Sequence, residues 1–212
     1  MICVSISEKD FHRCHKLVKQ FECCEIRLDL CSLSKEDMHD LFGTHKKLVA
    51  TYRPGTVGED VRKAGLIHAI ESGAAYVDIE IESDISFKKE LIEVARKHSC
   101  ASIISYHNFE FTPGAQVLEN IIEEGFSYGA DIVKIATYVK TEDDNAALMS
   151  VYKNKRRLVV FGMGDKGLIT RIAAPWLGAE FTFACVDDKS ATAPGQISHE
   201  KLTKIYDLIN KQ

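Results

Sequence analysis

The chain has 212 residues, of which 45% are hydrophobic and 27% are charged, and its formal net charge is -4. These values are typical of a folded globular protein and exclude disordered, collagen-like and low-complexity classes. The slight acidic excess also argues against nucleic acid or an anionic membrane surface as a partner, because such partners select for basic patches.

The cysteines and the hydropathy pattern indicate the cellular setting. The chain contains 7 cysteines, an odd number, and no Cys-x-x-Cys pair, which favours reduced thiols over a disulfide framework or a zinc ribbon. No run approaches about 18 consecutive apolar residues, and residues 1–10 lack the basic start and long apolar run of a secretory signal. We therefore expect a cytoplasmic protein that does not interact with membranes.

Short β-rich runs recur along the chain at near-even spacing, and most are rich in Val, Ile or Phe. They cover residues 2–6, 25–30, 48–51, 76–81, 101–105, 132–136, 158–161 and 180–184. Helical spacing of apolar residues fills segments between them, at 60–72, 87–98 and 115–128. In the first of these helices, the predicted buried stripe is Val61, Ala64, Ile67, His68 and Ile70; Gly125 or Gly129 is expected to end the third.

Alternation of strands and helices predicts a parallel sheet with right-handed crossovers. Dividing 212 residues by eight strands gives about 26 residues per unit, close to the smallest unit that closes a (β/α)8 barrel. An open doubly wound sheet is the alternative, but it would usually carry a glycine-rich turn where residues 5–9 read Ser-Ile-Ser-Glu-Lys. The prediction is an α/β fold, a single (β/α)8 TIM barrel domain over residues 1–212.

Charged residues recur at alternate positions of several predicted strands, mostly near the C-terminal ends. The intervening apolar residues must face the helices, so the charged set points into the barrel. Buried ions are stable only when they pair with one another or with a ligand, and barrel enzymes bind ligands at the C-terminal mouth. The pattern favours a ligand site, with a purely structural ion-pair network as the alternative. The inward set is Glu25, Arg27, Asp29, Arg53, Asp78, Glu80, His107 and Lys134.

Lys134 lies among apolar neighbours in this set, and other inward cations are expected nearby. Both features disfavour the ammonium form, and a neutral amine can attack a ketone or aldehyde to form an imine. Alone, the lysine could equally be one end of a structural ion pair. His107 ends the preceding strand and could act as the general base for a C–H bond beside an imine, with Glu80 orienting the imidazole.

Short motifs along nearly the whole chain resemble those of the type I 3-dehydroquinate dehydratases. Each motif is weak alone, but their order and barrel spacing together are specific. The motifs are Glu25-Ile26-Arg27-Leu28-Asp29, Asp78-Ile79-Glu80, Ser105-Tyr106-His107-Asn108-Phe109 with Thr112-Pro113, Asp131-Ile132-Val133-Lys134-Ile135-Ala136, Gly162-Met163-Gly164 with Gly167 and Thr170-Arg171, and Ala193-Pro194-Gly195-Gln196.

The resemblance implies a carbon–oxygen lyase of the shikimate pathway that converts 3-dehydroquinate to 3-dehydroshikimate by syn elimination of water. Lys134 would form a Schiff base with the C3 ketone, and His107 would remove the C2 proton and later protonate the departing C1 hydroxyl. Glu80 would hold His107. No metal and no cofactor would be needed, because the lysine supplies the electron sink.

The resemblance also implies a set of substrate contacts and a homodimer. Arg171 is the better candidate for the substrate carboxylate, and segment 187–198 is expected to close over the site as a lid. The family normally carries Glu-Gly-Gly where residues 54–59 stand, and Asn108 replaces its aspartate; Thr170 and Thr192 replace serines. The implied substrate contacts are Ser5, Glu25, Arg27, Arg53, Arg171, Thr192 and Gln196.

Two other functions stay open at this point. Another Schiff-base barrel lyase, such as a small aldolase, would need a phosphate cradle, for which Gly162, Gly164 and Gly167 are candidates. A barrel that binds a ligand without catalysis is the second, although the set of Lys134, His107 and Glu80 argues against it.

Overall fold

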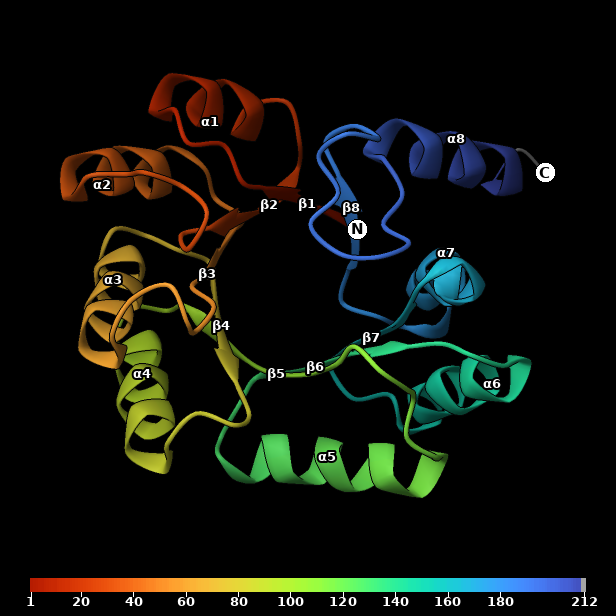
Figure 1. The fold of residues 1–212 in the computed structure, drawn as a ribbon. Coiled ribbons are helices and arrows are strands. Elements are labelled where there is room, and N and C mark those ends of the chain that lie inside the picture. Colours follow the sequence, from red (N-terminus) through yellow and green to blue (C-terminus); the bar gives the residue numbers. More distant parts are fainter. Residues whose placement is uncertain (211–212) are drawn as a thin grey trace.

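The computed structural model describes residues 1–210, so the last two residues of the predicted domain lie outside the described residues. Eight parallel strands surround a central axis and helices cover their outer side (Figure 1). The strand order is β7-β6-β5-β4-β3-β2-β1-β8, in which each strand lies beside its sequence neighbour. The predicted (β/α)8 barrel is therefore confirmed, because a doubly wound sheet would reverse its strand order at a switch point.

The elements alternate along the whole chain, and no helix within residues 1–210 is long and apolar enough to cross a membrane. The strands are β1 (Ile2–Ile6), β2 (Cys23–Arg27), β3 (Leu48–Thr51), β4 (Tyr76–Glu80), β5 (Ala101–Asn108), β6 (Ile132–Tyr138), β7 (Leu158–Met163) and β8 (Thr182–Cys185). The helices are α1 (Phe11–Val18), α2 (Lys35–Thr44), α3 (Glu59–Glu71), α4 (Ile85–Lys97), α5 (Ala115–Ser127), α6 (Glu142–Ser150), α7 (Leu168–Leu177) and α8 (His199–Asn210), with the short 3₁₀ turns η1 (Val151–Asn154) and η2 (Asp165–Gly167).

All eight predicted strands are present, but some bounds differ. The second begins at Cys23 and ends at Arg27, where the Arg27 carbonyl accepts hydrogen bonds from the backbone of Leu30 and Cys31 and turns the chain. Asp29 therefore lies beyond the strand. β5 continues to Asn108, because its backbone stays paired with β6 as far as Thr137, and this extension carries His107 into the barrel mouth.

The barrel interior is apolar at its N-terminal end and charged at its C-terminal end. Cys3, Cys23, Val49, Ile132 and Phe181 belong to one buried cluster inside the barrel. Farther along the strands, the register sets Glu80 beside Ser105 and Ser105 beside Lys134. The packed lower layers thus form a rigid floor beneath the charged mouth.

Two helices differ from their predicted buried faces. In α3 the buried residues are Arg62, Leu66, Ala69 and Ile70, while Val61 is 58% exposed, so the predicted stripe is out of phase. The helix is rotated toward Arg62 because that side chain reaches the carboxylate of Glu80 on β4.

The helical spacing of apolar residues predicts a buried stripe of Val117, Leu118, Ile121 and Ile122 in α5. Leu118 and Ile122 are buried, but Val117 is exposed. Gly125 lies inside this helix, where a Cβ would collide with Val133. The helix ends at Ser127, before Gly129, whose φ of +89° suits the turn that follows.

The ladder is interrupted between β7 and β8. Each of the other neighbouring strand pairs forms a ladder, and the described residues of β7 and β8 do not pair with each other. One backbone hydrogen bond, from Glu180 N to the Leu158 carbonyl at 2.9 Å, joins them at the N-terminal end. Helix α7 follows β7 and packs against both strands (Figure 1). We call this interruption the seam.

Candidate active site

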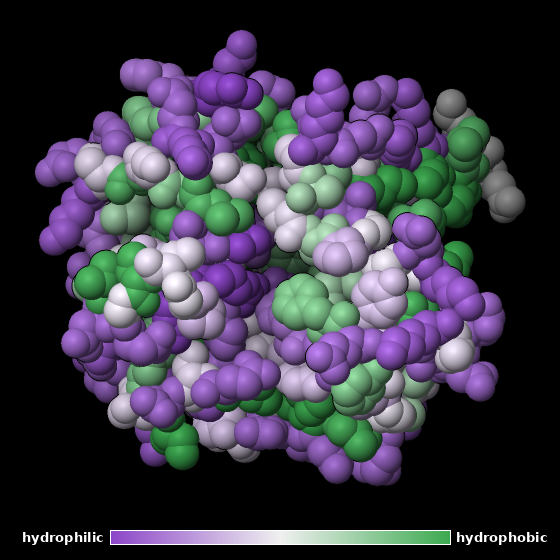
Figure 2. Space-filling view, in the orientation of Figure 1, coloured by the Kyte–Doolittle hydropathy of each residue, from purple (hydrophilic) through white to green (hydrophobic). Residues whose placement is uncertain are grey.

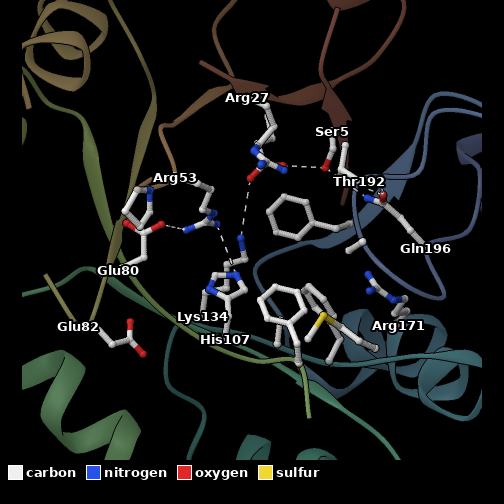
Figure 3. Close-up of a pocket in the computed structure, with 18 residues that line it drawn as sticks. Ser5, Arg27, Arg53, Glu80, Glu82, His107, Lys134, Arg171, Thr192 and Gln196 are labelled. Carbon is white, nitrogen blue, oxygen red and sulfur yellow. Dashed lines mark hydrogen bonds and ion pairs between the residues drawn. The ribbon is translucent and has the colours of Figure 1, made fainter. Parts of the chain in front are cut away.

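A cavity of about 380 Å³ opens at the C-terminal mouth of the barrel. Figure 2 shows the hollow near the centre of this face, with strongly hydrophilic residues on the β3–β4 side and paler or hydrophobic residues opposite. All the residues predicted for the site line the cavity: Ser5, Glu25, Arg27, Arg53, Glu80, His107, Lys134, Arg171, Thr192 and Gln196. Figure 3 labels all of these residues except Glu25 and shows their side chains around the cavity.

Lys134 extends from β6 into the buried base of this cavity. Its Nζ lies 2.9 Å from Asp78 Oδ2 and 3.8 Å from Glu25 Oε1, and 4.3 Å from the centre of the Phe183 ring. The expected cation is nearby, because Arg53 Nη2 contacts the same Asp78 Oδ2 at 3.3 Å, but the direct partners of the amine are two carboxylates. Lys134 is thus ion-paired.

Asp78 is the buried hub of the charged set. It accepts hydrogen bonds from Lys134 Nζ, from Arg53 Nη1 at 2.9 Å and from Ser105 Oγ at 2.6 Å. Burial alone would raise the pKa of this carboxyl, but the charges of Arg53, Lys134 and His107 outweigh burial and hold it far below its usual value. Asp78 thus stays ionised beside the lysine. The sequence had indicated only that this side chain points into the barrel.

His107 is kept neutral by its surroundings. Burial lowers the pKa of its imidazole well below 6.5, the cations Arg53 and Lys134 lower it further, and Asp78 opposes them. Its Nε2 lies 3.4 Å from Arg53 Nη2, and because a guanidinium can only donate, Nε2 is the acceptor. The ring of Phe109 stacks against it at 6.2 Å. A neutral histidine in this position can accept a proton from a bound molecule.

Glu80 does not contact His107, and the expectation that it holds the imidazole is wrong in this structure. Its Oε1 lies 2.5 Å from Arg53 Nη1 and its Oε2 lies 2.7 Å from Arg62 Nη1. Arg53 lies between the two predicted partners, because its planar head has enough donors to reach both (Figure 3). Burial would lower the pKa of Arg53, but Asp78, Glu80 and Glu25 raise it above its ordinary value.

The β1–β2 side of the cavity carries a second hydrogen-bonded group. Glu25 accepts from Ser5 Oγ at 2.7 Å and from Thr51 Oγ1 at 2.9 Å. Arg27 forms a two-point ion pair with Asp29, with contacts of 3.0 and 2.6 Å. The carboxylate and hydroxyl groups here are suited to binding hydroxyls of a ligand.

Arg171 differs from the other cations because its nitrogens lack a partner. The side chain is fully buried and reaches the barrel interior from the first turn of α7, beside the seam, with its guanidinium 4.2 Å from the Phe161 ring centre. Nε and Nη2 have no hydrogen-bond partner within the described part of the chain. Burial lowers the pKa of Arg171 to about 10. These two nitrogens form one edge of the guanidinium, the edge that binds a carboxylate at two points.

Segment 187–198 covers part of the cavity. Gln196 donates to Ser5 Oγ at 3.3 Å, and its Oε1 accepts from the backbone and hydroxyl of Thr192. The Pro194 carbonyl accepts from Gly164 N on the β7–α7 turn. Gly195, with a φ of +68°, packs so closely on Gly164 that a Cβ would collide with its backbone. The segment thus brings Thr192 and Gln196 to the cavity, and its closure as a lid stays a prediction.

The glycine-rich turn after β7 does not form a phosphate cradle. Gly162 N donates to Thr170 Oγ1, Gly164 N to the Pro194 carbonyl and Gly167 N to the Gly164 carbonyl. A phosphate cradle requires free N–H groups, so these contacts argue against the sugar-phosphate aldolase alternative. Thr170 instead stabilises the turn that precedes Arg171, because its hydroxyl accepts from Gly162 N and donates to the Gly167 carbonyl.

Sequence reasoning missed Arg62 and the apolar wall of the cavity. Arg62 had no visible signal, because it lies on a helix outside the barrel. Phe161, Met163 and Phe183 could have been found, since they share the inward alternation of their strands. Asn108, which replaces an expected aspartate, accepts from the backbone of residues 110 and 111 and shapes the loop.

Comparisons with known proteins agree with this geometry. Residues 2–212 match the family model described as type I 3-dehydroquinase. The chain is 35% identical over 194 residues to the 3-dehydroquinate dehydratase of Pyrococcus abyssi, covering 88% of this chain and 87% of that protein. It is 32% identical over 224 residues to the Methanocaldococcus jannaschii enzyme, covering 99% of each. The crystal structure of the Aquifex aeolicus VF5 enzyme superposes with a TM-score of 0.83 at 26% identity and 100% coverage of both chains. The chain therefore belongs to the type I 3-dehydroquinase family of hydro-lyases.

Proposed function

We propose that this protein dehydrates 3-dehydroquinate to 3-dehydroshikimate through a Schiff base on Lys134. The observation that carries the proposal is one cavity that holds a lysine, a neutral histidine and an arginine with two free nitrogens. A covalent amine, a proton carrier and a carboxylate receptor are the three groups that this reaction requires of the protein.

Substrate binding would complete the charge pairing of the cavity. Lys134, Arg27 and Arg53 already have carboxylate partners, whereas Arg171 does not. The single carboxylate of 3-dehydroquinate would take the free edge of Arg171. Its hydroxyls would reach Glu25, Ser5 and Gln196, and the ring would lie against the apolar wall.

Schiff-base formation would use the contact between Lys134 and Asp78. The lysine must give up a proton before it attacks the C3 ketone, and His107, held neutral, can accept one. The attack forms a carbinolamine, whose hydroxyl takes the proton held by His107 and leaves as water, giving a cationic iminium and a neutral imidazole. The ionised Asp78 carboxylate, 2.9 Å from Nζ, would stabilise that cation as it forms.

Elimination would then follow on the same face of the substrate. The iminium withdraws electrons from the C2–H bond, and His107 removes the proton to leave an enamine. The electrons return to expel the C1 hydroxyl, which His107 protonates so that it leaves as water. Arg53 makes the resulting imidazolium a stronger acid, because like charge disfavours it. Hydrolysis of the product imine restores Lys134.

Trapping with borohydride tests this mechanism. Borohydride added with 3-dehydroquinate should reduce the imine and leave a covalent adduct on Lys134, located by peptide mass spectrometry. Lys134→Met should abolish the adduct and lower kcat by about 10⁴-fold, measured by ultraviolet absorbance of the conjugated product. Lys88→Met is the matched control, because Lys88 is also buried but lies on α4 outside the cavity. An adduct on another lysine, or an active Lys134→Met enzyme, would reject the mechanism.

Three finer expectations stay predictions. These are a homodimer, a cytoplasmic location and a role in aromatic amino acid biosynthesis through the shikimate pathway. Light scattering coupled to gel filtration would test the first of them directly, with a mass near twice 23.7 kDa as the expected result.

A further inference from the structure

Arg62 is a buried cation on an outer helix that reaches a carboxylate of the barrel mouth. It extends from the first turn of α3 and is 1% exposed. Its Nη1 lies 2.7 Å from Glu80 Oε2, and its Nη2 lies 2.7 Å from Glu59 Oε2 and 3.0 Å from Ser83 Oγ. From the side of α4, the Phe87 ring covers the guanidinium at 4.2 Å. The head group is thus fixed by contacts from three directions.

Stability alone does not account for this arginine. Its Nε is buried without a hydrogen-bond partner among the described residues, which is unfavourable. Replacing a buried ion pair by apolar side chains of similar volume is often neutral or stabilising. An apolar residue at position 62 alone would leave the buried Glu80 oxygen without its cation, so the value of the arginine lies in what its charge and its donors hold.

Arg62 divides the Glu80 carboxylate between two arginines. With Oε2 paired to Arg62 Nη1, Arg53 contacts Glu80 through Oε1 alone, from its Nη1. The other terminal nitrogen of Arg53 is left for Asp78 Oδ2 at 3.3 Å and for His107 Nε2 at 3.4 Å. Without Arg62, Glu80 would be free to take both ends of the Arg53 guanidinium and draw it away from the imidazole.

We propose that Arg62 is a positioning residue that, by holding one oxygen of Glu80, keeps the Arg53 guanidinium against His107. The inference rests on the function proposed above, in which His107 carries the proton. Four charged groups face the imidazole: Arg53 from the β3–α3 segment, Lys134 from β6, Asp78 from β4 and Arg27 from β2. Of these, Arg53 is the one within hydrogen-bonding distance, so its position governs the charge that the ring experiences.

The expected direction of change follows from the charges. Loss of Arg62 removes a cation from the network and lets Arg53 move away from the ring. Both changes weaken the repulsion that disfavours the imidazolium, so the pKa of His107 should rise. The acid limb of kcat/KM, where activity falls as the base becomes protonated, should move to higher pH by the same amount.

The decisive measurement is an NMR titration of the histidine Cε1–H signals, with His107 assigned by its absence in His107→Asn. Arg62→Met should raise the midpoint by about half a unit to one unit, and Arg62→Lys, which keeps the charge but lacks the fork, by about 0.3 units. Lys88→Met should leave the midpoint unchanged, because this equally buried lysine on the next helix contacts the Ile81 carbonyl and the Tyr128 ring instead. The pH profile of kcat/KM is recorded on the same variants.

Each outcome decides the question. Unchanged midpoints in both Arg62 variants would overturn the proposal, as would an equal shift in Lys88→Met, which would mark a general effect of losing a buried cation. If Arg62→Met does not fold, Arg62→Lys decides alone. The titration does not depend on turnover, so an inactive wild-type enzyme would reject the proposed function while the role of Arg62 is still tested.

Discussion

The two walls of the cavity differ in whether their buried charges are paired. On the wall formed by β2 to β6, buried charges are paired, as in Lys134 with Asp78 and Arg53 with Glu80. On the wall formed by β7, β8 and α7, the Phe161 ring lies against the cation Arg171, whose Nε and Nη2 have no hydrogen-bond partner within residues 1–210. The paired wall is organised before the substrate arrives, whereas the other wall is completed only by an anion. In the mechanism proposed above, covalent and proton chemistry belong to the first wall, and binding of the substrate carboxylate belongs to the second.

The largest effect is expected from breaking the paired wall at its hub. Asp78→Asn removes the charge that Lys134 and Arg53 share, and should lower the free energy of unfolding by about 3–5 kcal/mol. Urea denaturation measures this change. Asp188→Asn is the control, since its pair with Lys201 is exposed to solvent and should contribute far less to the free energy of unfolding. A loss in Asp78→Asn no larger than in the control would show that the wall is not held by its ion pairs.

The opposite result is expected on the other wall. Arg171→Met replaces a buried cation whose free nitrogens lack partners, so the melting temperature should stay the same or rise. The value of kcat/KM should fall by about 10²-fold or more, because the substrate carboxylate loses a two-point contact. Calorimetry and steady-state kinetics on one preparation measure both. A loss of stability as large as that of Asp78→Asn would contradict the difference between the two walls.

A smaller effect is expected where the lid meets the β7–α7 turn. Gly195→Ala adds a Cβ at a φ of +68° and against the backbone of Gly164, so it should displace the lid. We expect kcat/KM to fall by about tenfold with little change in melting temperature, because the lid packs little core. Gly114→Ala is the matched control, since its φ is -63° and its Cβ would meet open space. Equal activity of the two variants would exclude a role for lid position.

The smallest effect is the pH dependence that His107 gives to folding. The folded state lowers its pKa below the unfolded value of about 6.5, so the unfolded chain binds more protons as the pH falls. This group therefore adds stability above about pH 6.5, and the stability is lost as the pH falls toward the folded pKa. Wild type should lose up to about 1.4 kcal/mol per pH unit more than His107→Asn in that window. Urea titrations at pH 5, 6 and 7 measure the difference, and parallel curves would contradict it.

The alternation of apolar and charged residues was enough to predict which strand residues point into the barrel. A barrel strand has only two sides, so Glu25, Asp78 and Lys134 could be placed inward from their apolar neighbours alone. The partner of each ion could not be predicted the same way. Arg53 has several donors and a flexible stem, and only the packed structure decides that it lies between Glu80 and His107.

Strand alternation could not predict the side chains that the outer helices contribute. Arg62 and Arg171 both belong to helices, where charged residues normally face solvent, yet both are buried against the barrel. The predicted stripe on α3 failed because a buried ion pair, rather than apolar area, sets the face of its first turn. Arg171 was predicted for the site only through the family resemblance.

The seam has a consequence for turnover. A ring of strands with every ladder complete resists widening equally on all sides, whereas a ring interrupted once is most compliant at the interruption. Arg171 and segment 187–198 both adjoin that point, one on each side of β8. Under the function proposed above, a small separation of β7 and β8 would weaken the contact of Arg171 with the substrate carboxylate and would move segment 187–198 at the same time. No strand ladder would break, so the product would leave while the ion pairs of the opposite wall stay in place.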